Sequence, residues 1–262
     1  MTNSGNLSLD QKNIDTILVL DFGSQYTQLI ARRVRDLNVY SVILPWDVSL
    51  EKIKSLNPKG VILSGGPESV TDSNTPRIPE IIFELNIPLL GICYGMQTLA
   101  EQFGGQDSSS TTKEFGHAQI TLEQTSLLFD GFGSGTLIDV WMSHGDHVST
   151  LPDEFNLIAS TSSAPVAAME HIEKPIYALQ FHPEVTHTDQ GGAILENFIL
   201  KICESNPQWR MEDLIEHRIQ EIKDKVGDQK VLLGLSGGAV SYTHLRAHET
   251  GRNVVCRLLL EK

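Results

Sequence analysis

The segment Gly91–Gly95 (Gly-Ile-Cys-Tyr-Gly) constrains the fold of this chain most, because it places a cysteine between two glycines at a sharp bend. The apolar run Ile87–Ile92 predicts a short buried strand, and Thr98–Phe103 predicts a helix that a glycine pair ends. Glycines permit such a tight turn, in which the central side chain is exposed on strained backbone. Near the N-terminus of a helix, unpaired amides and the helix dipole favour a thiolate. The sequence therefore predicts that Cys93 is a nucleophile.

A histidine and a carboxylate that could serve this cysteine follow a second predicted strand, Ile176–Gln180. In catalysis by a thiolate, an imidazole transfers the proton and a carboxylate orients the imidazole. A lone cysteine more often packs in a core, and an isolated His-Pro-Glu more often forms a loop. Their joint presence at strand ends predicts a catalytic site composed of Cys93, His182 and Glu184.

Short apolar runs alternate with helical or turn segments along the first part of the chain. This alternation predicts an α/β fold whose mostly parallel sheet is covered by helices on both faces. The predicted strands are Ile17–Leu20, Val39–Leu44, Val61–Leu63 and Leu89–Ile92. Between Ile120 and Glu170 apolar residues alternate and no helix is expected, which predicts a small antiparallel lobe. A helix from Gly192 to Cys203, with one apolar face, is expected to close the domain.

The composition argues against several classes of protein. The chain has 262 residues, 40% of them hydrophobic, and can bury a full core. It has no apolar run of the ~20 residues that a transmembrane helix needs. Three cysteines favour a reducing compartment over a disulfide framework, and a net charge of −13 argues against a nucleic-acid-binding surface. We therefore expect a cytoplasmic protein that binds neither membrane nor nucleic acid, and we predict no metal site in it.

The three predicted catalytic residues together resemble those of the class I glutamine amidotransferases, in which a cysteine hydrolyses glutamine and frees ammonia. Further stretches are similar to one member of this family, an ATP-dependent enzyme that aminates xanthosine monophosphate (XMP) to GMP. These stretches are Asp21–Tyr26, Ser64–Val70, Lys113–His117 and Val140–Asp146. The resemblance runs from about Ile14 to Gly238 and implies that the chain carries the glutaminase half of such an enzyme.

Elbow geometry and the resemblance together predict the rest of the site. The backbone N–H of Tyr94 is expected to donate to the oxyanion, with Gly66, at the end of a neighbouring strand, as the second donor. Gln97 lies one helical turn beyond Cys93, and the resemblance implies that it binds glutamine. The resemblance also implies a loop that holds the amino and carboxylate ends of the substrate, contributed by Ser143, His144 and Asp146.

Each of two further stretches has two competing interpretations. Lys113, Glu114 and His117 are expected either at a contact with a second domain or in a solvated charged loop. For Asp21–Tyr26 we favour a polar turn that caps a helix running through Leu37 over a direct part in catalysis.

Four segments are expected: a polar tail at 1–13, the amidotransferase domain at 14–205, a truncated start of an ATP pyrophosphatase domain at 206–238, and 239–262. Trp209–Val226 is predicted as an amphipathic helix. After it, a strand leads to Ser236, Gly237 and Gly238, which resemble the start of an ATP-binding loop. One reverse translation of Ser241–Thr250 resembles a transposase adapter used in sequencing libraries. We therefore interpret 239–262 as adapter read-through.

The resemblance implies that the glutaminase half needs no cofactor. It implies glutamine, XMP, ATP and Mg²⁺ for the complete enzyme, which is expected to be a homodimer. Three alternatives stay open: the glutaminase component of another class I amidotransferase, a catalytically silent regulatory module, and a hydrolase of the same fold acting on peptides or γ-glutamyl compounds. The intact set of cysteine, histidine and glutamate argues against the silent module.

Overall fold

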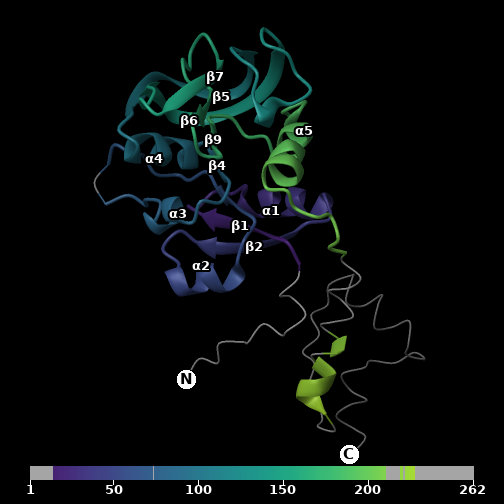
Figure 1. Cartoon of the computed structure of the whole chain (residues 1–262). Helices are drawn as coiled ribbons and strands as arrows, with labels where there is room; N and C mark the ends of the chain where they lie inside the picture. Colours follow the sequence, from purple (N-terminus) through teal and green to yellow (C-terminus); the bar gives the residue numbers. More distant parts are fainter. Residues whose placement is uncertain (1–13, 73, 211–218, 221, 228–262) are drawn as a thin grey trace, which may run out of the picture. The chain divides into compact units, whose positions relative to one another are not determined.

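The computed structural model describes residues 14–72, 74–210, 219–220 and 222–227, and the chain divides into two units, Met1–Arg210 and Met211–Lys262. In the described part of the first unit (Figure 1), nine strands form one sheet. Their order in the sheet is β2-β1-β3-β4-β9-β8-β7-β5-β6. The strands are β1 (Thr16–Asp21), β2 (Tyr40–Pro45), β3 (Gly60–Leu63), β4 (Leu89–Ile92), β5 (Gln106–Leu122), β6 (Leu137–Thr150), β7 (Phe155–Ser160), β8 (Ala168–His171) and β9 (Ile176–Leu179). The helices are α1 (Thr27–Asp36), α2 (Leu50–Leu56), α3 (Ile81–Glu84), α4 (Tyr94–Gln102), η2 (Leu127–Phe129), α5 (Gly191–Glu196) and η3 (Asn197–Ile202).

The half of the sheet formed by β2, β1, β3, β4 and β9 is parallel and covered on both faces. Ile17 and Val19 of β1 belong to a core cluster that includes residues of α1 and α5, whereas Leu18 and Leu20 belong to a cluster with α2, α3 and α4. Successive side chains of a strand point to opposite faces, so a strand buried on both sides is apolar throughout. The predicted parallel strands and their flanking helices are confirmed.

The other half of the sheet is antiparallel. Strand β8 pairs antiparallel with β9, β7 with β8, and β5 with both β7 and β6. The predicted antiparallel region is therefore confirmed, and the pairing of β8 with β9 makes it continuous with the parallel strands. One short helix, the 3₁₀ turn η2, lies in the region where no helix was expected.

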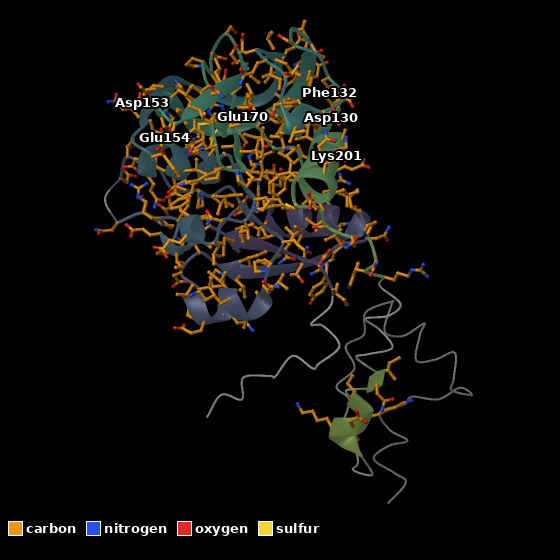
Figure 2. All side chains as sticks on the ribbon, in the orientation of Figure 1. Asp130, Phe132, Asp153, Glu154, Glu170 and Lys201 are labelled. Carbon is orange, nitrogen blue, oxygen red and sulfur yellow. The ribbon has the colours of Figure 1, made fainter. Side chains whose placement is uncertain are left out.

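The predicted closing helix is present but changes type along its length. Its first part is the α-helix α5, whereas η3 is π-helical. At the junction, the Asn197 side chain donates to the backbone oxygens of Leu128 and Asp130, and Lys201 pairs with the Asp130 carboxylate at 2.6 Å (Figure 2). Apolar periodicity predicts that a helix exists. It does not predict the wider π-helical turn, which occurs here beside the contacts of Asn197 and Lys201 with another part of the chain.

The predicted helix Trp209–Val226 is wrong at its start. Trp209 is not helical; its N–H donates to the Asn38 oxygen at 2.8 Å, and its ring lies 6.0 Å from that of Tyr40. In the second unit, 219–220 and 222–226 are helical, and Ile219 and Ile222 are exposed.

Several predictions lie outside the described residues. These are the tail 1–13, the ATP-loop residues Ser236, Gly237 and Gly238, and the segment 239–262. In the part of the chain that the structure describes, no helix combines the length and the apolar character that crossing a membrane requires.

His171, at the end of β8, is a buried histidine that holds a turn. Its Nδ1 accepts the N–H groups of Glu173 at 2.9 Å and Lys174 at 3.0 Å. Its ring packs against the aromatic rings of Phe103 and Phe155. Burial lowers the pKa of His171 below its ordinary value, although the charge of Glu154 opposes this. Protonating Nδ1 would remove the acceptor of both hydrogen bonds.

We expect His171 to make stability depend on pH. Because its folded-state pKa lies below the ordinary value of 6.5, its contribution is complete above that value and is lost as pH falls through the folded pKa. His171→Gln should therefore be less stable than the wild type at pH 8, and the difference should shrink towards pH 5. Thermal denaturation at both pH values measures this. A deficit of equal size at both would contradict it.

Candidate active site

The bend between β4 and α4 holds Cys93 in an unusual backbone conformation. Its φ is +53° and its ψ is −108°, outside the regions that non-glycine residues commonly adopt. Gly95 allows α4 to approach β3 closely, because a Cβ atom there would lie 2.6 Å from the Leu63 carbonyl oxygen. The Cys93 N–H donates to the Leu179 oxygen at 2.8 Å, which ties the bend to β9. The predicted strained elbow is present, but the Cys93 side chain is buried rather than exposed.

His182 and Glu184 form a buried pair just beyond β9. His182 Nδ1 lies 2.8 Å from Glu184 Oε1, and the carboxylate is fully buried. Burial lowers the pKa of His182, but Cys93 and Glu184 favour the imidazolium more strongly, so its pKa is raised above the ordinary value. Because Nδ1 faces the carboxylate, Nε2 is the nitrogen left for proton transfer.

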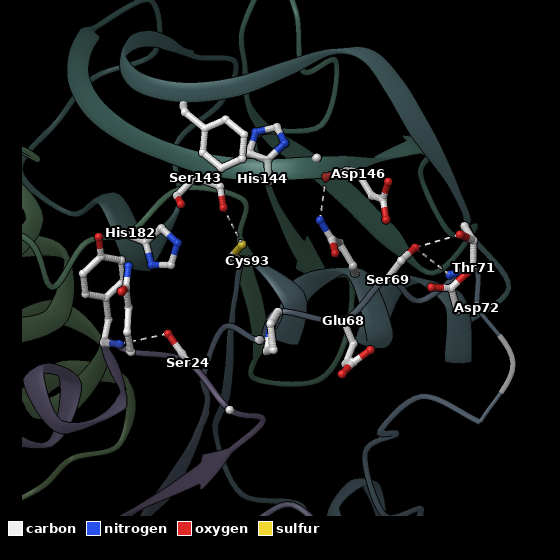
Figure 3. A pocket seen from close by; sticks show the side chains of 18 residues that line it. Ser24, Glu68, Ser69, Thr71, Asp72, Cys93, Ser143, His144, Asp146 and His182 are labelled. Atoms are coloured by element: carbon white, nitrogen blue, oxygen red, sulfur yellow. Dashed lines mark hydrogen bonds between the residues drawn. The ribbon is translucent and has the colours of Figure 1, made fainter.

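Cys93 and His182 both lie close to Gly65, which follows β3. A Cβ atom built on Gly65 would lie 3.6 Å from Cys93 Cβ and 3.3 Å from His182 Cε1. The Cys93 thiol donates to the Ser143 carbonyl oxygen at 3.6 Å (Figure 3). The structure thus brings the three predicted catalytic residues together, with Gly65 as a close neighbour that the sequence did not single out.

The two predicted oxyanion donors are adjacent. A Cβ atom on Gly66 would lie 3.3 Å from Tyr94 Cγ and 2.7 Å from the Phe22 oxygen, so only glycine fits there. Tyr94 is the first residue of α4, and the first N–H groups of a helix have no acceptor within it. This arrangement suits a pair of backbone donors beside Cys93, and their role stays a prediction.

A cavity of about 710 Å³ opens beside Cys93. Within the described residues, its lining includes three carboxylates and no lysine or arginine. The lining residues are Gly23, Ser24, Gln25, Tyr26, Gly66, Pro67, Glu68, Ser69, Thr71, Asp72, Cys93, Gln97, Phe115, Ser143, His144, Gly145, Asp146 and His182. Figure 3 shows Cys93 and His182 on one side and Glu68 and Asp72 on the other. The cavity therefore has a reactive end and an acidic end.

The residues predicted to bind glutamine all line the cavity, but the three that were assigned to a loop are not on one. Ser143, His144 and Asp146 lie within strand β6. The prediction of a loop is wrong because the long β5–β6 pairing extends past the active site. Gln97 Nε2 donates to the Asp146 backbone oxygen at 2.6 Å, which ties α4 to β6.

His144 is buried at the wall of the cavity. Burial, and next the charge of His147, lower its pKa to about 4, so His144 is neutral at pH 7. Its Nε2 lies 3.2 Å from Glu114 Oε2, and burial raises the pKa of Glu114. Glu114 and His117 belong to strand β5, so the reading of this stretch as a solvated loop is wrong.

Asp107, whose charge interacts with that of Asp146 in the cavity lining, is a buried titratable group that the sequence did not indicate. Both of its carboxylate oxygens are buried without a hydrogen-bond partner. Burial raises its pKa to about 7, and the charges of Asp146 and Glu101 add to this effect. Only the pairing of β5 with β6 brings Asp107 near Asp146.

The turn after β1 both begins α1 and lines the site. Asp21 Oδ1 accepts hydrogen bonds from the Gly23 N–H and the Thr27 hydroxyl, as expected for a structural turn. Ser24 and Tyr26 line the cavity, and the rings of Tyr26 and His182 lie 5.1 Å apart. The position of this turn at the carboxyl end of a parallel strand, where ligands commonly bind, was the available sequence signal.

Comparison with known proteins assigns the family. The sequence profile described as "Glutamine amidotransferase class-I" matches residues 18–202. This chain belongs to the class I glutamine amidotransferases. The predicted resemblance is therefore confirmed, and the match spans the sheet from β1 to the end of η3.

Two similar relatives of this amidotransferase carry the same name. The GMP synthase [glutamine-hydrolyzing] of Hamiltonella defensa is 50% identical over 255 residues, which are 94% of this chain and 49% of the relative. That of Teredinibacter turnerae is 55% identical over 232 residues, 86% of this chain and 44% of the relative. The chain spans about half the length of the curated relatives it matches.

Solved structures agree with this fold. A Thermoplasma acidophilum protein described as a GMP synthase subunit is 33% identical, with a TM-score of 0.63 over 80% of this amidotransferase and 98% of that chain. A glutamine amidotransferase from Thermotoga maritima, 21% identical with a TM-score of 0.53 over 80% of this chain and 92% of that chain, shares the fold.

Proposed function

We propose that this chain hydrolyses glutamine to glutamate and ammonia, with Cys93 as nucleophile. The observation that carries the proposal is the strained bend that presents Cys93 towards the buried His182–Glu184 pair beside a cavity. Membership of the class I amidotransferases supplies the reaction class.

In the first half of the proposed reaction, the Cys93 thiolate attacks the side-chain carbonyl carbon of glutamine. The backbone N–H groups of Gly66 and Tyr94 stabilise the resulting oxyanion. His182 then donates a proton to the departing nitrogen, ammonia leaves, and a glutamyl thioester remains on Cys93. Glu184 holds the imidazole in the tautomer and orientation that this transfer requires.

In the second half, His182 removes a proton from a water molecule, which attacks the thioester carbonyl. The carbon–sulfur bond breaks, glutamate leaves, and Cys93 returns to its starting state. Gln97, Ser143, His144 and Asp146 hold the substrate, and the acidic lining suits the α-ammonium group of glutamine. Neutral His144 can offer a hydrogen bond without adding charge.

We further propose that the ammonia is used to aminate XMP to GMP. The shared name of the relatives supports this proposal, as does their length, about twice that of the matched region. In that enzyme, residues 206–238 would begin an ATP pyrophosphatase domain that uses ATP and Mg²⁺, and the complete protein would be a homodimer. Hydrolysis of glutamine at Cys93 itself requires neither ATP nor Mg²⁺. The free thiols of Cys93 and Cys203 support a place in the reducing cytoplasm.

The test is the release of ammonia and glutamate from glutamine by the purified chain. Asparagine, γ-glutamyl peptides and an unrelated peptide serve as comparison substrates. Hydrolysis of glutamine alone supports the amidotransferase, whereas cleavage of the peptides would favour a different hydrolase of the same fold. No turnover of glutamine, with or without a complete synthetase domain, would refute the proposal.

A further inference from the structure

The backbone N–H and the backbone carbonyl of His182 are both linked to the backbone of Trp141 in β6. The His182 N–H donates directly to the Trp141 oxygen at 3.0 Å. The His182 carbonyl oxygen accepts the Thr188 hydroxyl at 2.7 Å, and that hydroxyl accepts the Trp141 N–H at 3.0 Å. Two connections therefore join His182 to Trp141. One is a direct hydrogen bond, and the other passes through the Thr188 hydroxyl.

The same strand also contacts the nucleophile. Two residues beyond Trp141, the Ser143 carbonyl oxygen accepts the Cys93 thiol at 3.6 Å. Strand β6 is thus the common frame against which both Cys93 and His182 are placed. A change in the distance between Trp141 and His182 would change the separation of the imidazole and the sulfur.

Thr188 is well suited to fix this distance. It is 4% exposed, and its β-branched side chain has few rotamers. Its hydroxyl acts once as donor and once as acceptor, so both of its main hydrogen-bonding capacities serve this connection. Arg33 Nε, from α1, donates to the Glu184 carbonyl oxygen at 2.9 Å, which holds the other end of the His182–Glu184 segment.

We propose that Thr188 is a positioning residue, whose hydroxyl sets the place of His182 relative to Cys93. The proposal rests on the glutaminase function proposed above. It assigns to Thr188 no contact with the substrate. Its effect should therefore fall on the chemical step and on the environment of the His182 ring.

The test compares Thr188→Val, which keeps the shape but removes the hydroxyl, with Thr188→Ser, which keeps the hydroxyl. For Thr188→Val we expect kcat for glutamine hydrolysis to fall about tenfold or more, with KM nearly unchanged, because a small misplacement of a catalytic group has effects of this order. Thr188→Ser should retain most of kcat. If Thr188→Val does not fold, the pair Thr188→Ala and Thr188→Ser gives the same comparison of the hydroxyl.

The second readout is the NMR titration of the His182 ring, which requires no glutamine turnover. The titratable groups around this ring are Cys93, Glu184, Tyr26 and His144. Since Cys93 and Glu184 raise the pKa of His182, a displaced ring should titrate closer to its ordinary value in Thr188→Val, but not in Thr188→Ser. Lack of hydrolysis by the wild type would refute the proposed function, while this titration would still decide the role of Thr188.

Two outcomes would overturn the proposal. One is a folded Thr188→Val with wild-type kcat and wild-type titration of His182. The other is an equal loss of kcat in Thr188→Ser and Thr188→Val, which would show that retaining the hydroxyl does not preserve the activity.

Discussion

Replacing Cys93 by serine should lower glutamine hydrolysis by about three orders of magnitude or more, because the residue that forms the covalent intermediate is lost. The serine hydroxyl is a far weaker acid than a thiol, and the pair His182–Glu184 is arranged for a neighbouring sulfur. The fold should remain intact, since serine is smaller than cysteine. Ammonia release and circular dichroism measure the two effects.

Cys203→Ser provides the matched control. Cys203 is also a buried free cysteine, and burial raises the pKa of its thiol, so it should not react as a thiolate. This variant should keep its glutaminase activity. A glutamine-like electrophile should label Cys93 and spare Cys203, as mass spectrometry can show. Labelling of Cys203 with Cys93 untouched would contradict the assignment of the nucleophile.

Adding one methyl group at Gly191 should damage both stability and activity. A Cβ atom there would overlap the carbonyl oxygen of Pro183 and lie 2.8 Å from its carbonyl carbon. Pro183 joins His182 to Glu184, and backbone cannot move aside as a flexible side chain can. Gly191→Ala should therefore lower the free energy of unfolding by about 1–3 kcal/mol. It should also reduce kcat, because the catalytic pair is displaced.

The neighbouring residue offers a control that differs by one position. Gly192 is also in α5, and a Cβ atom there would meet nothing within 4 Å. Gly192→Ala should therefore leave activity unchanged and raise the free energy of unfolding by about 0.4–1 kcal/mol, because alanine restricts the unfolded chain. Chemical denaturation and glutaminase assays of both variants measure this. Equal behaviour of the two would show that the contact with Pro183 has no effect.

Features that depend on short stretches of chain could be predicted from the sequence. Cys93 is flanked by the glycines that the bend requires, so its strained backbone follows from local sterics. His182 and Glu184 are two residues apart, close enough for their pairing to be predicted. The parallel strands could also be predicted from short stretches, because a strand buried on both faces must be apolar along its whole length.

Features that depend on the pairing of distant segments were decided by tertiary structure. The predicted substrate loop is part of strand β6 because β5 pairs with it beyond the active site. The neutral state of His144 and the raised pKa of Asp107 both follow from burial, which no local pattern specifies.

The family resemblance and the prediction that Cys93 is the nucleophile thus follow from the sequence alone, whereas the placement of the proposed base, His182, was completed by tertiary structure. Thr188 lies six residues beyond His182, and its hydroxyl links the His182 carbonyl oxygen to Trp141 of the distant strand β6. Glycine is required at position 191 because α5 packs against the backbone of Pro183 there. The physical reason is that steric limits on a bend act within a few residues. Hydrogen bonds and close contacts between elements exist only after the sheet has assembled.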